Sequence, residues 1–238
     1  MFILEGPCLD RIKQIFEKYF DERVESYDTD INFSLGYREM IPYIIKLANI
    51  KPTDVVVDVG CGTGKLSLVF ASIAKKVIAI DISSKMLKKA REETEKNDIR
   101  NIEFRKANCM NLQIGNSSVN IVVSNLVLHH LTDEEKLTTI KEFYRILKPK
   151  GKIIIGDIVK SRKDFREEID LIVKNYKKRY GVQKTFDKLI EMIERMFFIT
   201  EYPATPQKWN QILSLVGFRK NIIKQIRGPL WVLHGIKC

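Results

Sequence analysis

Short apolar runs alternate with amphipathic segments along the middle of the chain. The runs are rich in β-branched residues, are too short for helices, and end at Asp, Gly, Asn or Ser. They predict strands at residues 55–59, 76–80, 119–124 and 152–158, the first of them buried, and the alternating stretch "NIEFRK" predicts a further strand at residues 101–106. The segments between them place apolar residues at helical spacing and predict helices at residues 64–74, 83–96 and 132–147. Strand followed by helix, repeated, is typical of a parallel sheet covered on both faces.

Capping residues mark several helix ends within this alternation. Ser83 or Ser84 is expected to cap the second helix, with Met86, Leu87 and Ala90 facing inward. Thr132 precedes the third helix and Glu135 occupies the capping-box position. The sequence "KPKG" is expected to stop that helix.

The two ends of the chain and one segment near residue 180 follow other patterns. The first fifty residues read as helical in at least two pieces, the second over residues 36–50. A charged, helical insertion follows over residues 161–199. A helix at residues 205–216 carries Pro206 in its first turn and Gly217 at its end. Two strands, 218–226 and 230–236, are joined by "RGP" and predict a closing hairpin.

These patterns predict one domain in four parts. They are an N-terminal helical cap (1–50), a ligand-binding core (51–160), a helical substrate-cap insertion (161–204) and a C-terminal helix with hairpin (205–238).

Three glycines lie between the first strand and its helix, in "VVVDVGCGTGKLS". Ligands of open parallel sheets bind beyond the carboxyl ends of the strands, where this loop is expected. Glycine lets the loop turn sharply and lets a ligand approach the main chain. The spacing is G-x-G-x-G, which differs from the dinucleotide and phosphate-loop patterns.

Two carboxylates accompany the glycine loop. Asp81 ends the second strand, where a carboxylate can accept hydrogen bonds from both hydroxyls of a ribose, or can simply be solvated. Asp58 can orient the loop, meet a cationic ammonium group, or act as a structural brace.

The stretches "VVVDVGCGTGKLS", "VIAIDIS", "NLVLHHL" and "RILKPKGKIII" resemble the class I S-adenosylmethionine-dependent methyltransferases, in the branch with the ubiquinone/menaquinone-type and other small-molecule enzymes. The resemblance implies an α/β fold with a doubly wound, seven-stranded, mostly parallel sheet whose last strand is antiparallel. It also implies S-adenosyl-L-methionine as cofactor and a small-molecule or lipid-like methyl acceptor.

The same resemblance implies the cofactor-binding residues. Around the methionine part it places the loop and Asp58, at the ribose Asp81, and at the adenine Ile82 and Met86, although Met86 fits the core equally well. The expected set is Asp58, Gly60, Cys61, Gly62, Gly64, Asp81, Ile82, Met86, Asn108, Cys109 and Asn125. The chain departs from the family at Asn108 and Asn120, where acidic residues are usual.

Methyl transfer from a sulfonium is an in-line displacement with a neutral leaving group. It needs orientation above all, so no metal and no fixed catalytic constellation are expected. The loop "SNLVLHH" follows the fourth strand and lacks the [DNS]-P-P-[YF] pattern of enzymes that methylate base amines. His129 and His130 are candidate bases, or pack beside the cofactor. Tyr27 resembles the segment that closes over the cofactor, or packs its helix onto the sheet.

Composition and charge leave competing functions open. The net charge is +11, and residues 202–238 contain no acid, so RNA is a possible partner and a solvated basic face is the simpler interpretation. An NAD-dependent oxidoreductase fits Asp81 but not the glycine spacing. A protein that binds the cofactor without catalysing a reaction is a further hypothesis. The four scattered cysteines, with neither a secretory signal nor a long apolar run, predict a cytoplasmic protein with reduced thiols and no membrane span.

Overall fold

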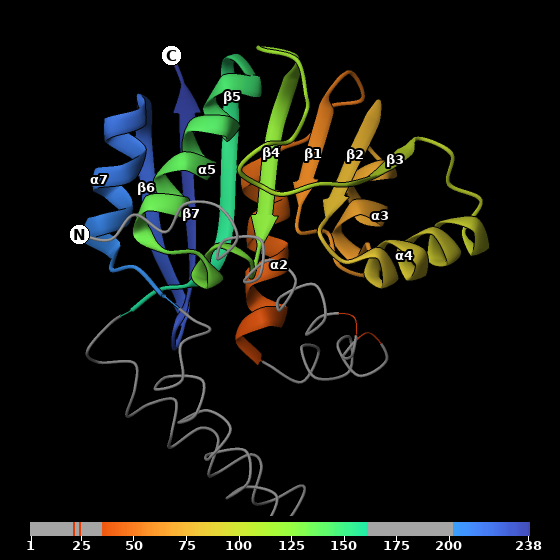
Figure 1. Cartoon of the computed structure of the whole chain (residues 1–238), viewed down its shortest axis with the longest axis horizontal. Coiled ribbons are helices and arrows are strands. Elements are labelled where there is room, and N and C mark those ends of the chain that lie inside the picture. Colours follow the sequence, from red (N-terminus) through yellow and green to blue (C-terminus); the bar gives the residue numbers. More distant parts are fainter. Residues whose placement is uncertain (1–20, 22–23, 25–34, 161–201) are drawn as a thin grey trace, which may run out of the picture.

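A seven-stranded sheet forms the centre of the protein (Figure 1). The structure is a computed structural model that describes residues 21, 24, 35–160 and 202–238. The strand order is β3-β2-β1-β4-β5-β7-β6. The strands are β1 (Val55–Val59), β2 (Lys76–Asp81), β3 (Ile102–Lys106), β4 (Val119–Asn125), β5 (Leu147–Ile158), β6 (Phe218–Arg227) and β7 (Leu230–Lys237).

Strands β1 to β5 pair in parallel, and β7 runs antiparallel to both β5 and β6. The predicted parallel sheet with a closing antiparallel hairpin is therefore confirmed. The chain order reverses between β1 and β4, so the carboxyl ends of these two strands open side by side at the edge where open α/β sheets bind ligands.

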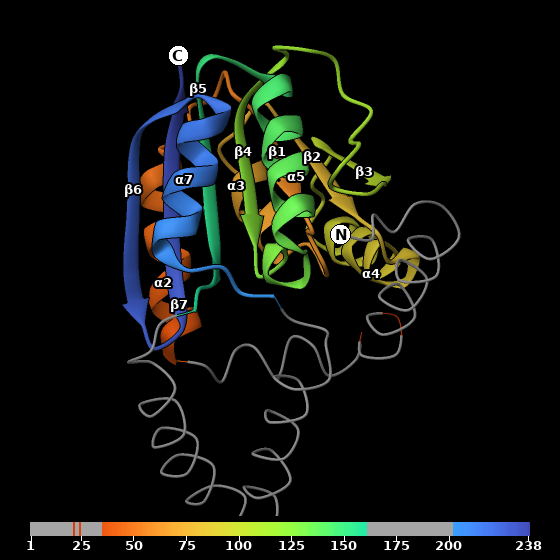
Figure 2. The ribbon, with the colours of Figure 1, turned by 60° about the vertical axis from the view of Figure 1, so that its left-hand side comes forward.

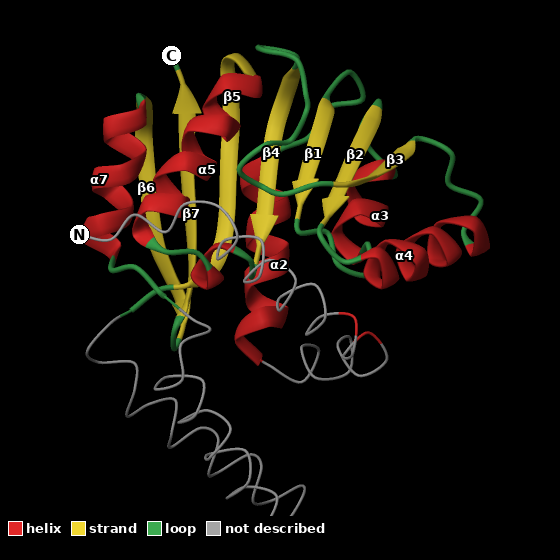
Figure 3. Ribbon diagram, viewed as in Figure 1, coloured by secondary structure: helices red, strands yellow, loops and turns green. Residues whose placement is uncertain are grey.

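Helices cover both faces of the sheet, as Figure 2 and Figure 3 show. Helices α5 (Asp133–Ile146) and α7 (Pro206–Val216) bury Phe143 and Trp209 in one core cluster. Helices α2 (Leu35–Ala48) and α3 (Lys65–Ala71) bury Met40 and Phe70 in a second cluster on the other face. Helix α4 (Ser84–Lys96) packs at β2 and β3, and the short 3-10 helix η1 (Leu128–His130) follows β4.

The helix caps form as their sequences predict. Ser83 accepts a hydrogen bond from Met86 N, which settles the cap of α4 in its favour over Ser84. Thr132 and Glu135 form a complete capping box at α5. Thr205 caps α7, and Gly217 ends it with φ +112°.

Two predicted boundaries are wrong. The first helix ends at Ala71 rather than residue 74, because Ile73 N bonds only three residues back to Phe70 O and Lys75 N bonds to Asp54 O just before β2. The sequence "KPKG" does not separate α5 from its strand, because β5 begins at Leu147, which pairs with Val119 across a register shift.

Several predictions concern residues outside the described ranges. They include Tyr27, the first N-terminal helix and residues 161–201 of the insertion. Among the helices that the structure describes, none has the length and apolar character to cross a bilayer.

Candidate functional site

The glycine loop after β1 has a backbone that only glycine adopts readily. Gly60, Gly62 and Gly64 have φ angles of +73°, +53° and +83°. A Cβ at Gly60 would lie 2.1 Å from Val127 Cγ2, a distance that a real contact cannot have. Gly60 N and Cys61 N both donate to Ile80 O, which fixes the loop to the end of β2. The loop after β1 and the loop after β4 therefore touch at Gly60 and Val127.

Asp81 lies buried at the end of β2, directly beside this loop. Its Oδ2 accepts from Gly62 N and its Oδ1 from Ser83 N, each at 2.8 Å. Burial raises the pKa of Asp81, and these main-chain hydrogen bonds oppose that rise. Ile82 N–H is a further main-chain donor to this group, and a carboxylate has about four lone-pair sites, so acceptor capacity remains for the hydroxyls of a ribose.

Asp58 is the second buried carboxylate at this edge. Its Oδ2 accepts a hydrogen bond of 2.6 Å from Ser67 Oγ on α3. Burial raises the pKa of Asp58 to about 6, the Ser67 hydrogen bond lowers it, and the charge of Asp81 raises it further. Among the described residues neither acid forms an ion pair, so the pair favours a ligand that brings positive charge.

The residues expected at the adenine lie around Asp81 with differing exposure. Ile82 is half-buried, whereas Met86 is 1% exposed and belongs to the packed face of α4. Asn108 Oδ1 accepts from Met110 N at 2.9 Å and from Cys109 Sγ at 3.7 Å, so both of its lone pairs have donors within the chain. Cys109 Sγ lies 3.6 Å from Thr139 Oγ1, a contact that points toward α5. Asn120 lies within β4, where its Oδ1 accepts from Val55 N and Lys148 Nζ in a structural role.

The loop after β4 begins with an unpaired polar atom and a strained residue. Asn125 Oδ1 is buried and has no hydrogen-bond partner among the residues that the structure describes. Leu126 has φ +56°, which is costly for a leucine, and its N–H donates to Gly156 O. Strained backbone of this kind is held by its surroundings and concentrates at functional sites.

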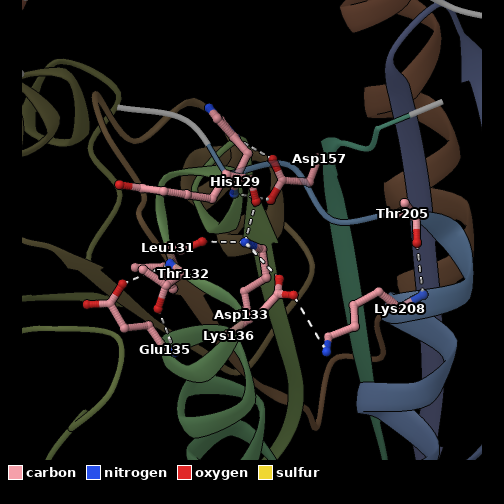
Figure 4. Close-up of polar contacts among 10 residues, drawn as sticks. His129, Leu131, Thr132, Asp133, Glu135, Lys136, Asp157, Thr205 and Lys208 are labelled. Atoms are coloured by element: carbon pink, nitrogen blue, oxygen red, sulfur yellow. Dashed lines mark hydrogen bonds and ion pairs between the residues drawn. The ribbon is translucent and has the colours of Figure 1, made fainter. Parts of the chain in front are cut away.

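His129 follows in η1 and is oriented by Asp157 of β5, as Figure 4 shows. The Nδ1–Oδ1 distance is 2.5 Å, and His129 N donates to Asp157 Oδ2 at 3.0 Å. Asp157 is fully buried and His129 is 5% exposed. A carboxylate facing Nδ1 holds the proton there and leaves the lone pair on Nε2. The ring centroids of His129 and His130 lie 3.9 Å apart.

Sequence reasoning missed three residues of this site: Ser67, Lys136 and Asp157. The signals were present. Asp157 is a single acid inside the apolar run "KIIIGDI", and Lys136 is a cation on the inward face of α5. Their partners lie far away along the chain, so spacing alone does not pair them.

Comparison with known proteins agrees with this geometry. A model of the methyltransferase domain family matches residues 50–217, which is well over half of the chain. An uncharacterized methyltransferase of Geobacillus sp. (strain WCH70) is 31% identical over 231 residues, covering 94% of this chain and 96% of that protein.

Two further similarities are more limited. An arsenite methyltransferase of Halobacterium salinarum is 33% identical over 117 residues, which are 48% of this chain and 29% of that protein. The crystal structure of a SAM-dependent methyltransferase from Aquifex aeolicus has a TM-score of 0.64 at 17% identity and covers 92% of this chain and 98% of that one. The last similarity concerns the fold. With the family model and the full-length relative, the chain belongs to the methyltransferase domain family and is a class I S-adenosylmethionine-dependent methyltransferase.

Proposed function

We propose that this protein transfers a methyl group to a small-molecule acceptor, with the cofactor held by the loop Gly60–Gly64 and Asp81. The observation that carries the proposal is the buried Asp81 carboxylate, hydrogen-bonded to the glycine loop and retaining lone pairs for a ribose diol. The cofactor, when bound, supplies the electrophilic methyl group. Its sulfonium and ammonium charges suit a pocket edge that contains two buried acids.

The remaining cofactor contacts follow from position. Gly60, Gly62 and Gly64 have positive φ angles and carry no side chain, so the methionine part can approach the main chain of the loop, Cys61 included. Ile82 is the accessible apolar contact for adenine, and Met86 supports it from beneath. Asn108, Cys109 and Asn125 complete the proposed set.

His129 is the proposed general base for an acceptor that must lose a proton. Its Nε2 has no hydrogen bond to any residue in the described part of the chain, while Asp157 holds Nδ1. Nε2 accepts the proton of the acceptor's O–H or N–H group as the methyl group is transferred. Asp157 stabilises the imidazolium that forms, and the imidazolium then releases its proton to solvent.

The contact between Val127 and Gly60, which joins the loop that carries His129 to the glycine loop, supports this role. The two reactants of a methyl transfer must meet in line, so adjacent loops for cofactor and base provide the required proximity. A base held next to the cofactor favours transfer to oxygen or nitrogen over transfer to a soft anion such as a thiolate, which needs no base.

The basic tail gives limited support to the alternative, an RNA substrate. Lys208 pairs with Asp133, and Arg227 pairs with Glu39. Lys237 Nζ donates to Tyr144 O and Leu147 O. These cations have partners within the chain, so a structural use of the tail accounts for much of its charge, which favours the small-molecule acceptor.

Calorimetric titration with S-adenosylmethionine tests the proposal. Asp81→Ala removes the diol acceptor and leaves Gly62 N and Ser83 N unpaired, so we expect affinity to fall by about ten- to a hundredfold. The matched control is Asp98→Ala, because Asp98 is an exposed carboxylate that pairs with the exposed Arg100. Unchanged affinity in the Asp81 variant, or tighter binding of NAD by the wild type, would contradict the proposal.

A further inference from the structure

Lys136 is a fully buried lysine beside His129, and the cofactor does not explain it. It lies in the first turns of α5, and Figure 4 shows its ammonium among the polar groups around His129 and Asp133. Its Nζ donates to two main-chain carbonyls, Leu131 O and Tyr202 O, the latter at 2.5 Å. Asp133 Oδ1 lies 3.9 Å away.

A cation at this place is costly. Burial lowers the pKa of Lys136, and the positive end of the helix dipole opposes a cation near the start of α5. The charges of Asp133, Asp157, Glu135 and Glu134 offset part of that cost by raising the pKa. An apolar side chain of the same length would avoid the cost, as replacements of buried ion pairs often show. The two carbonyl contacts are therefore the feature that distinguishes lysine here.

The two carbonyls belong to segments that hold His129. Leu131 ends η1, and its N–H bonds back to Leu128 O. Tyr202 N donates to His129 O at 2.5 Å, so the Tyr202 residue is bound on one side by His129 and on the other by Lys136. Lys160 N donates to Ala204 O in the same stretch, so this stretch also bonds to the chain just after β5.

We propose that Lys136 is a positioning residue: its ammonium clamps the carbonyls of Leu131 and Tyr202 and so holds His129 in register with Asp157. The clamp acts on the main chain on both sides of the imidazole. Without it, the direct bond from Tyr202 N to His129 O is left to join Tyr202 to η1, and His129 Nδ1 no longer meets Asp157 Oδ1 in one geometry. This inference rests on the proposed role of His129 as the base.

Nitrogen NMR of the full-length protein in alkaline buffer measures the His129 tautomer without an acceptor. The chain has only three histidines, so the His129 signals are assigned by their absence in His129→Gln. We expect a single Nδ1–H tautomer in the wild type. In Lys136→Met we expect loss of that single tautomer and a mixture of Nδ1–H and Nε2–H forms.

Lys208→Met is the matched control. Lys208 contacts the same Asp133 carboxylate at 3.6 Å and loses the same charge, but its side chain is 40% exposed and its Nζ contacts neither carbonyl. It should keep the wild-type tautomer. Calorimetry with S-adenosylmethionine on each variant shows that the cofactor site is intact.

The possible outcomes separate the two proposals. A folded Lys136→Met protein with a single Nδ1–H tautomer contradicts the positioning role of Lys136 and leaves the proposal that His129 is the base unaffected. An Nε2–H tautomer in the wild type overturns the base itself. If the Met variant does not fold, Lys136→Gln takes its place. Its shorter, neutral amide cannot bridge both carbonyls, so a mixture supports the clamp and a single Nδ1–H tautomer contradicts it.

Discussion

At the scale of single residues, the site is built from groups that cost stability. Asp58 and Asp81 are buried acids without a cation among the described residues, Leu126 is strained, and Asn125 Oδ1 is unpaired. Such costs persist where function needs them. Removal of the charge at Asp58 should therefore stabilise the fold while it weakens the site.

Asp58→Asn tests this expectation through pH. The carboxyl has its ordinary pKa of 3.8 when unfolded and about 6 when folded. Below the lower value both states are protonated and the group has no effect. As pH rises, Asp58 ionises first in the unfolded state. Above the higher pKa its buried charge lowers the free energy of unfolding by about 3 kcal/mol.

The asparagine variant should therefore unfold less readily in urea at neutral pH, by up to that amount. The gain should disappear as pH falls to about 4. Asp98→Asn, at an exposed position, should show little gain at any pH. A less stable Asp58→Asn protein at neutral pH would mean that the Ser67 hydrogen bond outweighs burial.

Gly60→Ala should be strongly destabilising, because it combines a φ of +73° with a Cβ that meets Val127 Cγ2. Gly228 has φ +53° and open space around it, so Gly228→Ala carries the backbone strain alone. We expect about 1 kcal/mol for Gly228→Ala and about 2–4 kcal/mol for Gly60→Ala by urea denaturation. Equal losses would show that Val127 moves aside without cost.

At the scale of elements, sequence patterns predicted what is local. The β-branched runs, the capping box at Thr132 and the stop at Gly217 each depend on neighbours within a few residues, and all formed as expected. The start of β5 was wrong because Leu147 joins the sheet through Val119, a partner far away in sequence.

The candidate site divides in the same way. The glycine loop and Asp81 belong to one continuous strand–loop–helix–strand unit, so their spacing placed them together. The contacts of His129 with Asp157, and of Lys136 with Tyr202, cross between elements that only the fold brings together. For these contacts the residue types indicated candidates, but which residues pair becomes visible only in the folded structure.

The cap of α4 gives a prediction at this scale. Ser83 Oγ accepts from Met86 N and donates to Asp21 Oδ1. At α7, Thr205 Oγ1 accepts one capping hydrogen bond, from Lys208 N. Thr205→Ala should cost about 1 kcal/mol. Ser83→Ala should cost more, about 2 kcal/mol, because the site is buried and a second bond is lost. Equal costs in thermal unfolding would show that the Asp21 contact contributes nothing.

At the scale of the whole molecule, ligand binding and stability are linked. The proposed cofactor contacts come from the loops after β1, β2, β3 and β4, so they join segments spread across half of the sheet. A ligand that binds only the folded state stabilises it by about 2.7 kcal/mol at a hundred times its dissociation constant.

A thermal melt with S-adenosylmethionine at that excess should therefore show a midpoint raised by about 5–10 °C for a chain of this size. NAD at the same concentration should leave the midpoint unchanged, because the G-x-G-x-G loop differs in spacing from a dinucleotide loop. Asp81→Ala should lose most of the shift at the wild-type ligand concentration, since its affinity is lower. A shift with NAD and none with S-adenosylmethionine would assign the glycine loop to a dinucleotide, and the acid pair would then need another role.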